Sequence, residues 1–155
     1  MAGYVTRPVA QEYVSKKLSG ATAVEIGTFL NVDLVNNEYD LPAANATADI
    51  IFVANEIDRA VDYNTDDETH TIAAGELIKG KKIIQTEEYI TTKITANALA
   101  AALGTELGVG TGGTLATIAD LAVANLDAFR KTFTIVKKTK LFMKDALIVE
   151  ANVKF

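Results

Sequence analysis

The sequence predicts a mainly β fold: a small β-barrel or sandwich-like domain with short inserted α-helices and an N-terminal arm. Short apolar runs rich in Val, Ile and Phe recur between turn residues, which is typical of strands. Helical spacing of apolar residues occurs in two Ala-rich stretches within residues 95–131. With 155 residues, of which 49% are hydrophobic, the chain is long enough for one domain with a substantial core.

Residues 1–20 differ from the rest of the chain and are predicted to form an N-terminal arm before a single β-rich domain over residues 21–155. Apolar residues are sparse in this segment, and Pro8 disfavours a helix immediately before it. Residues 9–18 fit either a short helix or an extended arm. A segment that buries little against its own domain often becomes ordered on a partner.

The strand signals begin at residue 24. Residues 24–34 mix apolar and polar positions, and Gly27 breaks the alternation as a β-bulge would. Residues 36–37 are both Asn, which tolerates positive φ and predicts a turn. Residues 48–56 contain a continuous apolar run, which is typical of a strand buried on both faces.

The next β region covers residues 71–94. Gly75 and Gly80 predict turns within it, because glycine adopts positive φ without steric cost. Residues 82–86 and 89–94 alternate and predict two strands.

The two helical stretches follow. Residues 95–104 begin with Thr95, a good N-cap, and end at Gly104, a good residue for the position just after a helix. Residues 117–131 have apolar residues near helical spacing and predict a second helix. A helical insertion near residues 95–131 is therefore expected inside the β-rich domain.

The end of the chain predicts a β-hairpin. Residues 132–142 and 146–155 have strand patterns, and a turn is expected at Lys144 and Asp145 between them. The order of strands in the sheets does not follow from the sequence.

Composition excludes several function classes. A net charge of −5 and a pI near 4.9 argue against nonspecific nucleic-acid binding, which rests on Lys and Arg neutralising phosphates. The absence of cysteine excludes disulfides, thiolate metal sites and cysteine nucleophiles. No apolar run approaches the ~18 residues of a transmembrane helix, and the N-terminus lacks a signal-peptide pattern, so we expect a soluble protein made in a cytoplasm. Two lysine-rich groups are expected on solvated strand faces or turns: Lys79, Lys81 and Lys82, and Arg130, Lys131, Lys137, Lys138 and Lys140.

Gly108, Gly110 and Gly113 have the spacing of a dinucleotide-binding fingerprint. That fingerprint requires a buried strand before it and a helix that opens at its third glycine. Here the preceding segment is the predicted helix of residues 95–104, and the following one is a Thr-flanked β segment. We therefore predict that these glycines form a flexible hairpin turn at the edge of the β domain, with no cofactor bound.

Asp62, Asn64 and Asp66 stand at alternate positions, as the first ligands of a calcium-binding loop do. The sixth and twelfth positions are Asp67 and Ala73, where such a loop requires Gly and Glu. We predict no metal site, although a weak cation site in the loop from Asp62 to Glu68 remains an alternative.

No catalytic set is recognisable in the sequence. His70 is the only histidine and is expected at the surface, so no multi-histidine metal site can form. The carboxylates of Glu87, Glu88 and Asp120 are expected on exposed turns, whereas acid–base catalysis needs environments that separate their pKa values. We predict that the protein is not an enzyme and has no catalytic, cofactor-binding or metal-binding residues.

The β segments resemble the small β-barrel decoration proteins of tailed-bacteriophage heads, also called cement or head-stabilisation proteins. The resemblance rests on a Gly-Thr pair in residues 26–33, an apolar strand in 50–58 and a Gly-Glu turn followed by a strand in 75–90. Residues 106–115, 133–142 and 146–152 fit the ending of that family. The two Ala-rich helical stretches depart from a simple barrel.

The resemblance implies a structural virion protein that binds the outer surface of the capsid and stabilises the expanded head. It implies the major capsid protein as partner, a homo-oligomer with a trimer favoured, and a location on the capsid exterior, without nucleic-acid or membrane binding. The arm is expected to add a strand to a neighbouring edge. The alternatives are a tail or head-completion protein, or a cation- or carbohydrate-binding β module. The candidate capsid contacts are Tyr4, Arg7, Pro8, Val9 and Tyr13.

Overall fold

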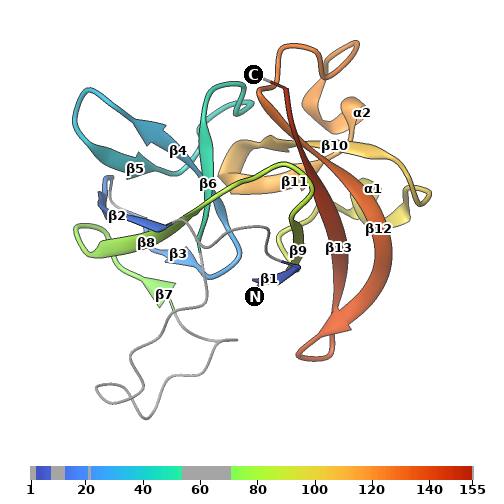
Figure 1. The fold of residues 1–155 in the computed structure, drawn as a ribbon, viewed down its shortest axis with the longest axis horizontal. Coiled ribbons are helices and arrows are strands. Elements are labelled where there is room, and N and C mark those ends of the chain that lie inside the picture. Colours follow the sequence, from blue (N-terminus) through green and yellow to red (C-terminus); the bar gives the residue numbers. More distant parts are fainter. Residues whose placement is uncertain (1–2, 8–12, 21, 54–70, 155) are drawn as a thin grey trace.

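The structure is a computed structural model that describes residues 3–7, 13–20, 22–53 and 71–154. Its strands form a closed five-stranded barrel, a six-stranded sheet and a small two-stranded sheet (Figure 1). Two short helices lie beside the six-stranded sheet. The predicted mainly β fold with a barrel and short inserted helices is therefore confirmed.

The barrel has the strand order β2-β5-β4-β6-β8. The pair β2–β5 is parallel and the other pairs are antiparallel. The two-stranded sheet joins β3 (Val24–Glu25) to β7 (Thr71–Ile72). The barrel strands are β2 (Tyr13–Leu18), β4 (Phe29–Asp33), β5 (Glu38–Asp40), β6 (Ile50–Val53) and β8 (Leu77–Lys82).

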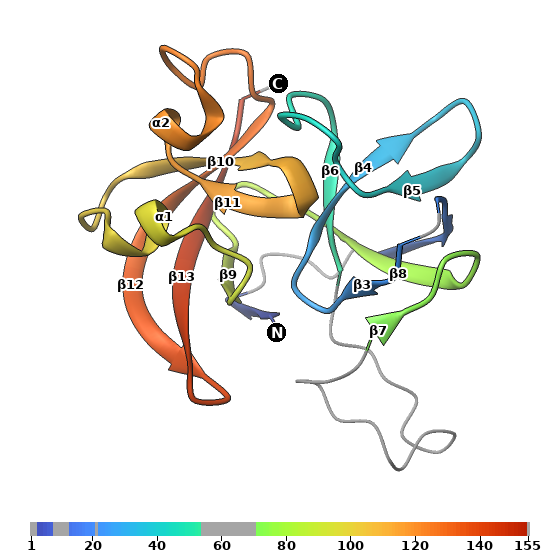
Figure 2. The ribbon, with the colours of Figure 1, turned by 180° about the vertical axis from the view of Figure 1, so that it is seen from behind.

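The six-stranded sheet is antiparallel throughout and has the order β1-β9-β13-β12-β10-β11. Figures 1 and 2 show this sheet on the opposite side of β6 from β5 and β2. Its members are β1 (Gly3–Arg7), β9 (Glu88–Thr91), β10 (Glu106–Gly110), β11 (Thr114–Ala116), β12 (Lys131–Leu141) and β13 (Lys144–Val153).

Strand β6 shows why the predicted buried run is continuously apolar. Successive side chains of a strand point to opposite faces. Ile50 and Phe52 therefore pack into the core between the barrel and the six-stranded sheet, whereas Ile51 and Val53 pack into the core inside the barrel. Because both faces of this strand are covered, every position has to be apolar.

Four aromatic rings form the centre of the core between barrel and sheet. Phe29 and Phe52 come from the barrel, and Tyr89 and Phe133 come from the six-stranded sheet. The ring centroids of Phe29 and Phe133 are 4.8 Å apart, and those of Phe52 and Tyr89 are 5.0 Å apart. Tilted rings at these distances add to the stabilisation that burial provides, which fixes the barrel against the sheet.

The helices α1 (Ala96–Ala100) and α2 (Ile118–Leu121) are shorter than predicted. Thr95 caps α1 as expected, because its Oγ1 accepts a hydrogen bond from the Ala98 amide at 3.1 Å. Helix α2 ends after one turn, where Ala122 takes a left-handed conformation. A third apolar cluster lies against α2 and consists of Ala116, Leu121, Leu126 and Phe129.

Several predicted boundaries were wrong. Gly27, with a φ of 89°, lies in a turn that separates β3 from β4, where a bulge was predicted. Gly80 lies inside β8 and not in a turn. A glycine is needed there because the Tyr39 ring occupies the space that a Cβ would need. Of the strand predicted over residues 82–86, only Lys82 is in a strand, as the last residue of β8, and the chain turns at Thr86, which has a φ of 70°.

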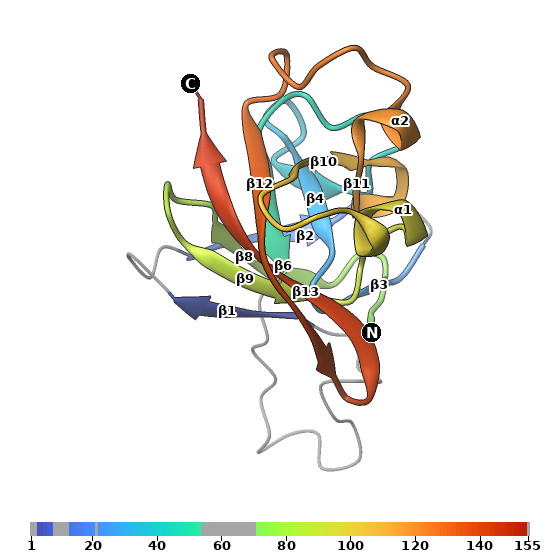
Figure 3. The same cartoon turned by 90° about the vertical axis from the view of Figure 1, so that its right-hand side faces the viewer.

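The final hairpin is confirmed, but its turn lies two residues earlier than predicted. Leu141 pairs with Lys144, so the turn consists of Phe142 and Met143 rather than of Lys144 and Asp145. The pair of strands forms a long twisted ribbon whose turn lies beyond the rest of the sheet (Figure 3). The turn escaped prediction because such turns usually contain Asn or Gly.

Residues 3–7 and 13–18 are strands, so the short helix considered for residues 9–18 does not form over residues 13–18. Gly3–Arg7 pairs with β9, and Tyr13–Leu18 is one of the barrel strands. Of the described strands, only β9 pairs with β1, which leaves β1 at the end of the sheet order. A strand at the end of a sheet is a place where a further strand can pair.

Candidate functional site

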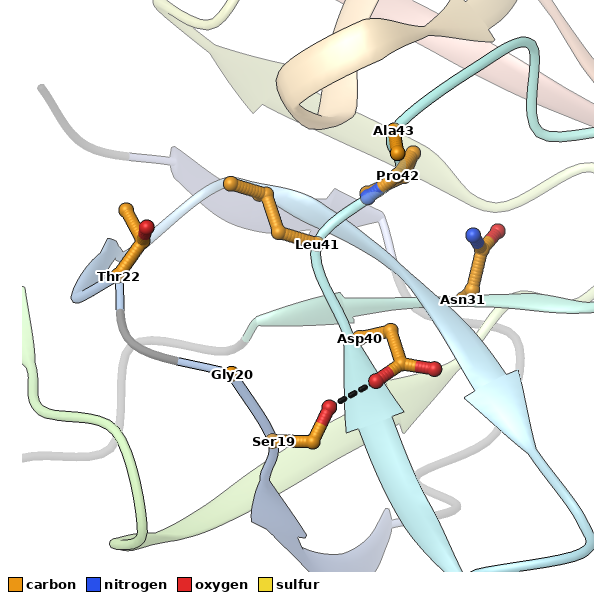
Figure 4. Close-up of a pocket in the computed structure, with 8 residues that line it drawn as sticks. All are labelled: Ser19, Gly20, Thr22, Asn31, Asp40, Leu41, Pro42 and Ala43. Atoms are coloured by element: carbon orange, nitrogen blue, oxygen red, sulfur yellow. Dashed lines mark hydrogen bonds between the residues drawn. The ribbon is translucent and has the colours of Figure 1, made fainter.

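The strongest candidate site is a pocket at the ends of β2 and β5 (Figure 4). Its volume is about 470 Å³, within the range of about 300–1,000 Å³ that ligand pockets occupy. One wall is polar and the other is apolar. The lining residues are Ser19, Gly20, Thr22, Asn31, Asp40, Leu41, Pro42 and Ala43.

The parallel pairing of β2 with β5 creates this pocket. Leu18 pairs with Tyr39, so the next residues, Ser19 and Asp40, lie side by side. The Ser19 amide donates to the Tyr39 carbonyl oxygen at 2.9 Å, and the Ser19 hydroxyl donates to Asp40 Oδ1. Pro42 lacks the amide that a continued strand would use. The chain therefore leaves β5 here and forms the apolar wall.

The Asp40 carboxylate gives the pocket its electrostatic character. Partial burial raises the pKa of Asp40 above its ordinary range, and the negative charges of Asp33 and Glu38 raise it further. A positively charged group placed beside Asp40 would counter both effects. The pocket therefore suits a cationic or hydrogen-donating head on an apolar stem, as in a lysine side chain.

The glycine-rich segment forms a β-hairpin, as predicted, but it is not a flexible edge turn. Gly108 and Gly110 are buried, and a Cβ on either would lie about 2.9 Å from Phe129 or Leu121. Gly113 is also buried, and a Cβ there would overlap the Phe29 carbonyl oxygen. The glycines are needed because α2 and the barrel pack directly against the hairpin backbone.

A smaller cavity of about 190 Å³ lies beside this hairpin, and Asp120 is on its wall. The Asp120 carboxylate accepts hydrogen bonds from the Thr95 hydroxyl at 2.6 Å and from the Asn97 amide at 2.7 Å. These two bonds are the main reason why the pKa of Asp120 lies below its ordinary range. Asp120 also completes a capping box with Thr117. It thus joins the N-termini of both helices, which is a structural role.

Lys81 and Glu87 contradict the predictions of a solvated lysine face and of exposed carboxylates. Both side chains are completely buried, and Lys81 Nζ donates to Glu87 Oε1 at 2.9 Å. Alternation along β8 would place Lys81 on the exposed face with Leu77 and Lys79. Instead two successive residues, Gly80 and Lys81, are buried.

Lys131 also contradicts the prediction that the lysine-rich groups lie on solvated faces. It is 9% exposed and forms an ion pair with Asp49. Lys137, Lys138 and Lys140 are exposed, as predicted.

Of the five residues predicted to contact a capsid, three are described, and they belong to two different sheets. Tyr4 and Arg7 belong to β1, where they pair in register with Ile90 and Glu88 of β9. Tyr13 belongs to the barrel strand β2. Pro8 and Val9 lie outside the described residues.

The predicted cation loop from Asp62 to Glu68 and the single histidine, His70, also lie outside the described residues. Within residues 3–7, 13–20, 22–53 and 71–154, no group of three or more His, Cys, Asp or Glu side chains could hold a metal ion. In the same residues no helix has the length and apolarity needed to cross a membrane.

Sequence reasoning missed the pocket of Ser19 and Asp40. No local sequence pattern marks the pocket, because the pocket depends on a parallel pairing between segments whose register the sequence does not reveal.

Comparison of the sequence with protein-family models and with curated proteins gave no match.

Proposed function

We propose that this protein is a structural virion protein that binds the outer surface of a phage capsid and stabilises the expanded head. The observation that carries the proposal is the small closed barrel. Three of the segments that resemble decoration proteins contain β4, β6 and β8, which are neighbours in that barrel. The segments nearer the end of the chain contain β9, β13, β12 and β10, which are neighbours in the six-stranded sheet. The resemblance therefore involves neighbouring strands within each of the two sheets.

The surface of the molecule offers contacts of the kind that such binding needs. Leu34 and Val35 are 80% and 91% exposed at the tip of the β4–β5 hairpin. The Asp33 carboxylate accepts hydrogen bonds from the amides of Val35 and Asn36, which holds this tip in one conformation. Exposed apolar residues on a rigid support are favourable interface anchors, because little entropy is lost on binding.

Strand β1 offers a second type of contact. It is the first strand in the sheet order, and β9 is its only partner among the described strands. A neighbouring chain that adds a strand there would gain main-chain hydrogen bonds along β1. Many such contacts, repeated by the symmetry of a head, give stability through multivalency. We propose the major capsid protein as the partner, with the protein acting as a homo-oligomer, a trimer favoured, on the capsid exterior.

The test is cosedimentation of the purified protein with expanded, undecorated capsids over a range of salt concentrations. We expect saturable binding at a fixed number of copies per capsid. The variant Arg7→Ala should weaken binding, whereas Lys93→Ala, which removes a cation outside residues 1–20, should not. Absence of cosedimentation at every salt concentration would refute the proposal. Rings or tubes of the protein in negative-stain micrographs, together with absence of binding to capsids, would favour the alternative of a tail or head-completion protein.

A further inference from the structure

The tip of the β12–β13 hairpin combines backbone strain with apolar exposure. Phe142 and Met143 both have positive φ, 51° and 64°, as the central residues of a two-residue turn. Positive φ is unfavourable for large side chains, and Asn-Gly usually occupies such turns. Met143 is 93% exposed and Phe142 is 39% exposed. Strain and exposure together at one turn indicate that these side chains serve an intermolecular contact.

The strands beside this tip are positively charged. Lys137, Lys138 and Lys140 are exposed on β12. Asp145, on β13, pairs with Lys140 at 3.1 Å. The exposed apolar tip therefore adjoins a strand segment with more cations than this carboxylate balances, and its best complement is an apolar hollow with carboxylates at its rim.

The pocket at the ends of β2 and β5 has those properties. Leu41, Pro42 and Ala43 form its apolar wall, and the charges that act on Asp40 there are those of Asp33 and Glu38. Two lysines of β2 lie near the neighbouring carboxylates but do not line the pocket. The charge of Lys16 acts on Asp33, and Lys17 pairs in register with Glu38. Neither lysine is among the charges that shift the pKa of Asp40, the carboxylate that lines the pocket.

We propose that the β12–β13 tip of one copy binds in the Asp40 pocket of a second copy of this chain. Met143 enters the apolar part of the pocket, and the exposed lysines of β12 face Asp40. Figures 1 and 2 show the tip and the β2–β5 region at opposite sides of the molecule, so a copy cannot fill its own pocket.

The contact joins two different surfaces, so it is heterologous. Each copy keeps a free tip or a free pocket until the chain of copies closes into a ring or continues as an open assembly. Because the pairing is partly electrostatic and exposed, it should weaken as salt rises. The proposal does not depend on capsid binding, and the experiment uses this protein alone.

The experiment is sedimentation velocity over a range of protein concentrations with the wild type and two variants. Phe142→Asn combined with Met143→Gly supplies the residues that this turn prefers, so the hairpin stays folded while the knob is lost. Asp40→Asn removes the charge of the pocket and keeps its shape. Each variant should weaken self-association about tenfold or more. The control variant Leu103→Ser removes an exposed apolar side chain that belongs neither to the tip nor to the pocket. It should leave self-association unchanged.

Mixing the two variants provides the decisive result. The Asp40→Asn protein keeps an intact tip, and the doubly substituted protein keeps an intact pocket. Their mixture should form pairs and nothing larger, because only one intact contact per pair remains. A wild type that stays monomeric at every concentration, variants that associate as the wild type does, or a mixture that stays monomeric would each overturn the proposal. Met143→Ser serves as a second tip variant with the same expected loss.

Discussion

Lys81 Nζ lies 2.9 Å from Glu87 Oε1, and neither side chain has any exposed area. Lys81 is in the barrel strand β8, and Glu87 directly precedes β9 of the six-stranded sheet. The same carboxylate oxygen accepts hydrogen bonds from the Tyr89 hydroxyl at 2.8 Å and from the Ile84 amide at 3.2 Å. This buried ion pair therefore fixes the point at which the chain passes from the barrel to the sheet.

We expect Lys81→Met to lower the free energy of unfolding by about 3–5 kcal/mol, because it leaves the Glu87 charge buried without a cation. Adding Glu87→Gln should recover a large part of this loss, since the amide oxygen still accepts from Tyr89 and Ile84. Urea unfolding of the wild type, both single variants and the double variant measures the coupling. Equal losses in the Lys81→Met protein and the double variant would contradict this account.

Gly113 and its neighbour Gly112 provide a matched pair of substitutions. Both have positive φ, 70° and 78°, so alanine at either position carries the cost of a left-handed conformation, about 1–2 kcal/mol. At Gly112 the nearest atom to a new Cβ is 3.8 Å away, whereas at Gly113 it would overlap the Phe29 carbonyl oxygen. Thermal unfolding should show a clearly larger loss for Gly113→Ala than for Gly112→Ala. Similar losses would mean that the hairpin can move away from β4.

Asp120 makes stability depend on pH in acid. Hydrogen bonds from Thr95 and Asn97 lower the pKa of Asp120 in the folded protein. Its stabilising contribution is therefore complete above the ordinary aspartate pKa of about 3.9 and is lost as the pH falls through the lower folded value. The variant Asp120→Asn should be less stable than the wild type at neutral pH, and the difference should shrink below about pH 4. Urea midpoints measured against pH test this, and a constant difference would contradict it.

Tyr39 makes stability depend on pH in base. Burial raises the pKa of Tyr39 to about 12, with a smaller contribution from the charge of Asp49. The neutral phenol is favoured in the folded state, so its contribution is complete below the unfolded pKa of about 10 and is lost as the pH rises toward 12. Tyr39→Phe should cost about 0.5–1.5 kcal/mol at neutral pH by removing the hydrogen bond to the Val14 carbonyl. The difference from the wild type should shrink as the pH rises from 10 to 12.

Local rules were enough to predict much of the fold. The Thr95 cap, the turn at Asn37 and the buried run of β6 follow from residues close together in the chain. The pocket was not predictable in this way, because Ser19 and Asp40 meet through a parallel pairing. The buried positions of Gly108 and Lys81 depend on contacts with Phe129 and Glu87 that appear only when separate elements pack.

The place of β13 has a consequence for synthesis on the ribosome. All five barrel strands have been made once Lys82 is complete, so the barrel can close while the rest of the chain is still being translated. The six-stranded sheet has to wait, because its inner strand β13, between β9 and β12, is the last to emerge. Until then the nascent barrel presents Phe29 and Phe52 without the sheet that covers them. A chain that stalls before Lys144 therefore carries an exposed aromatic face, which is a target for chaperones and a starting point for aggregation.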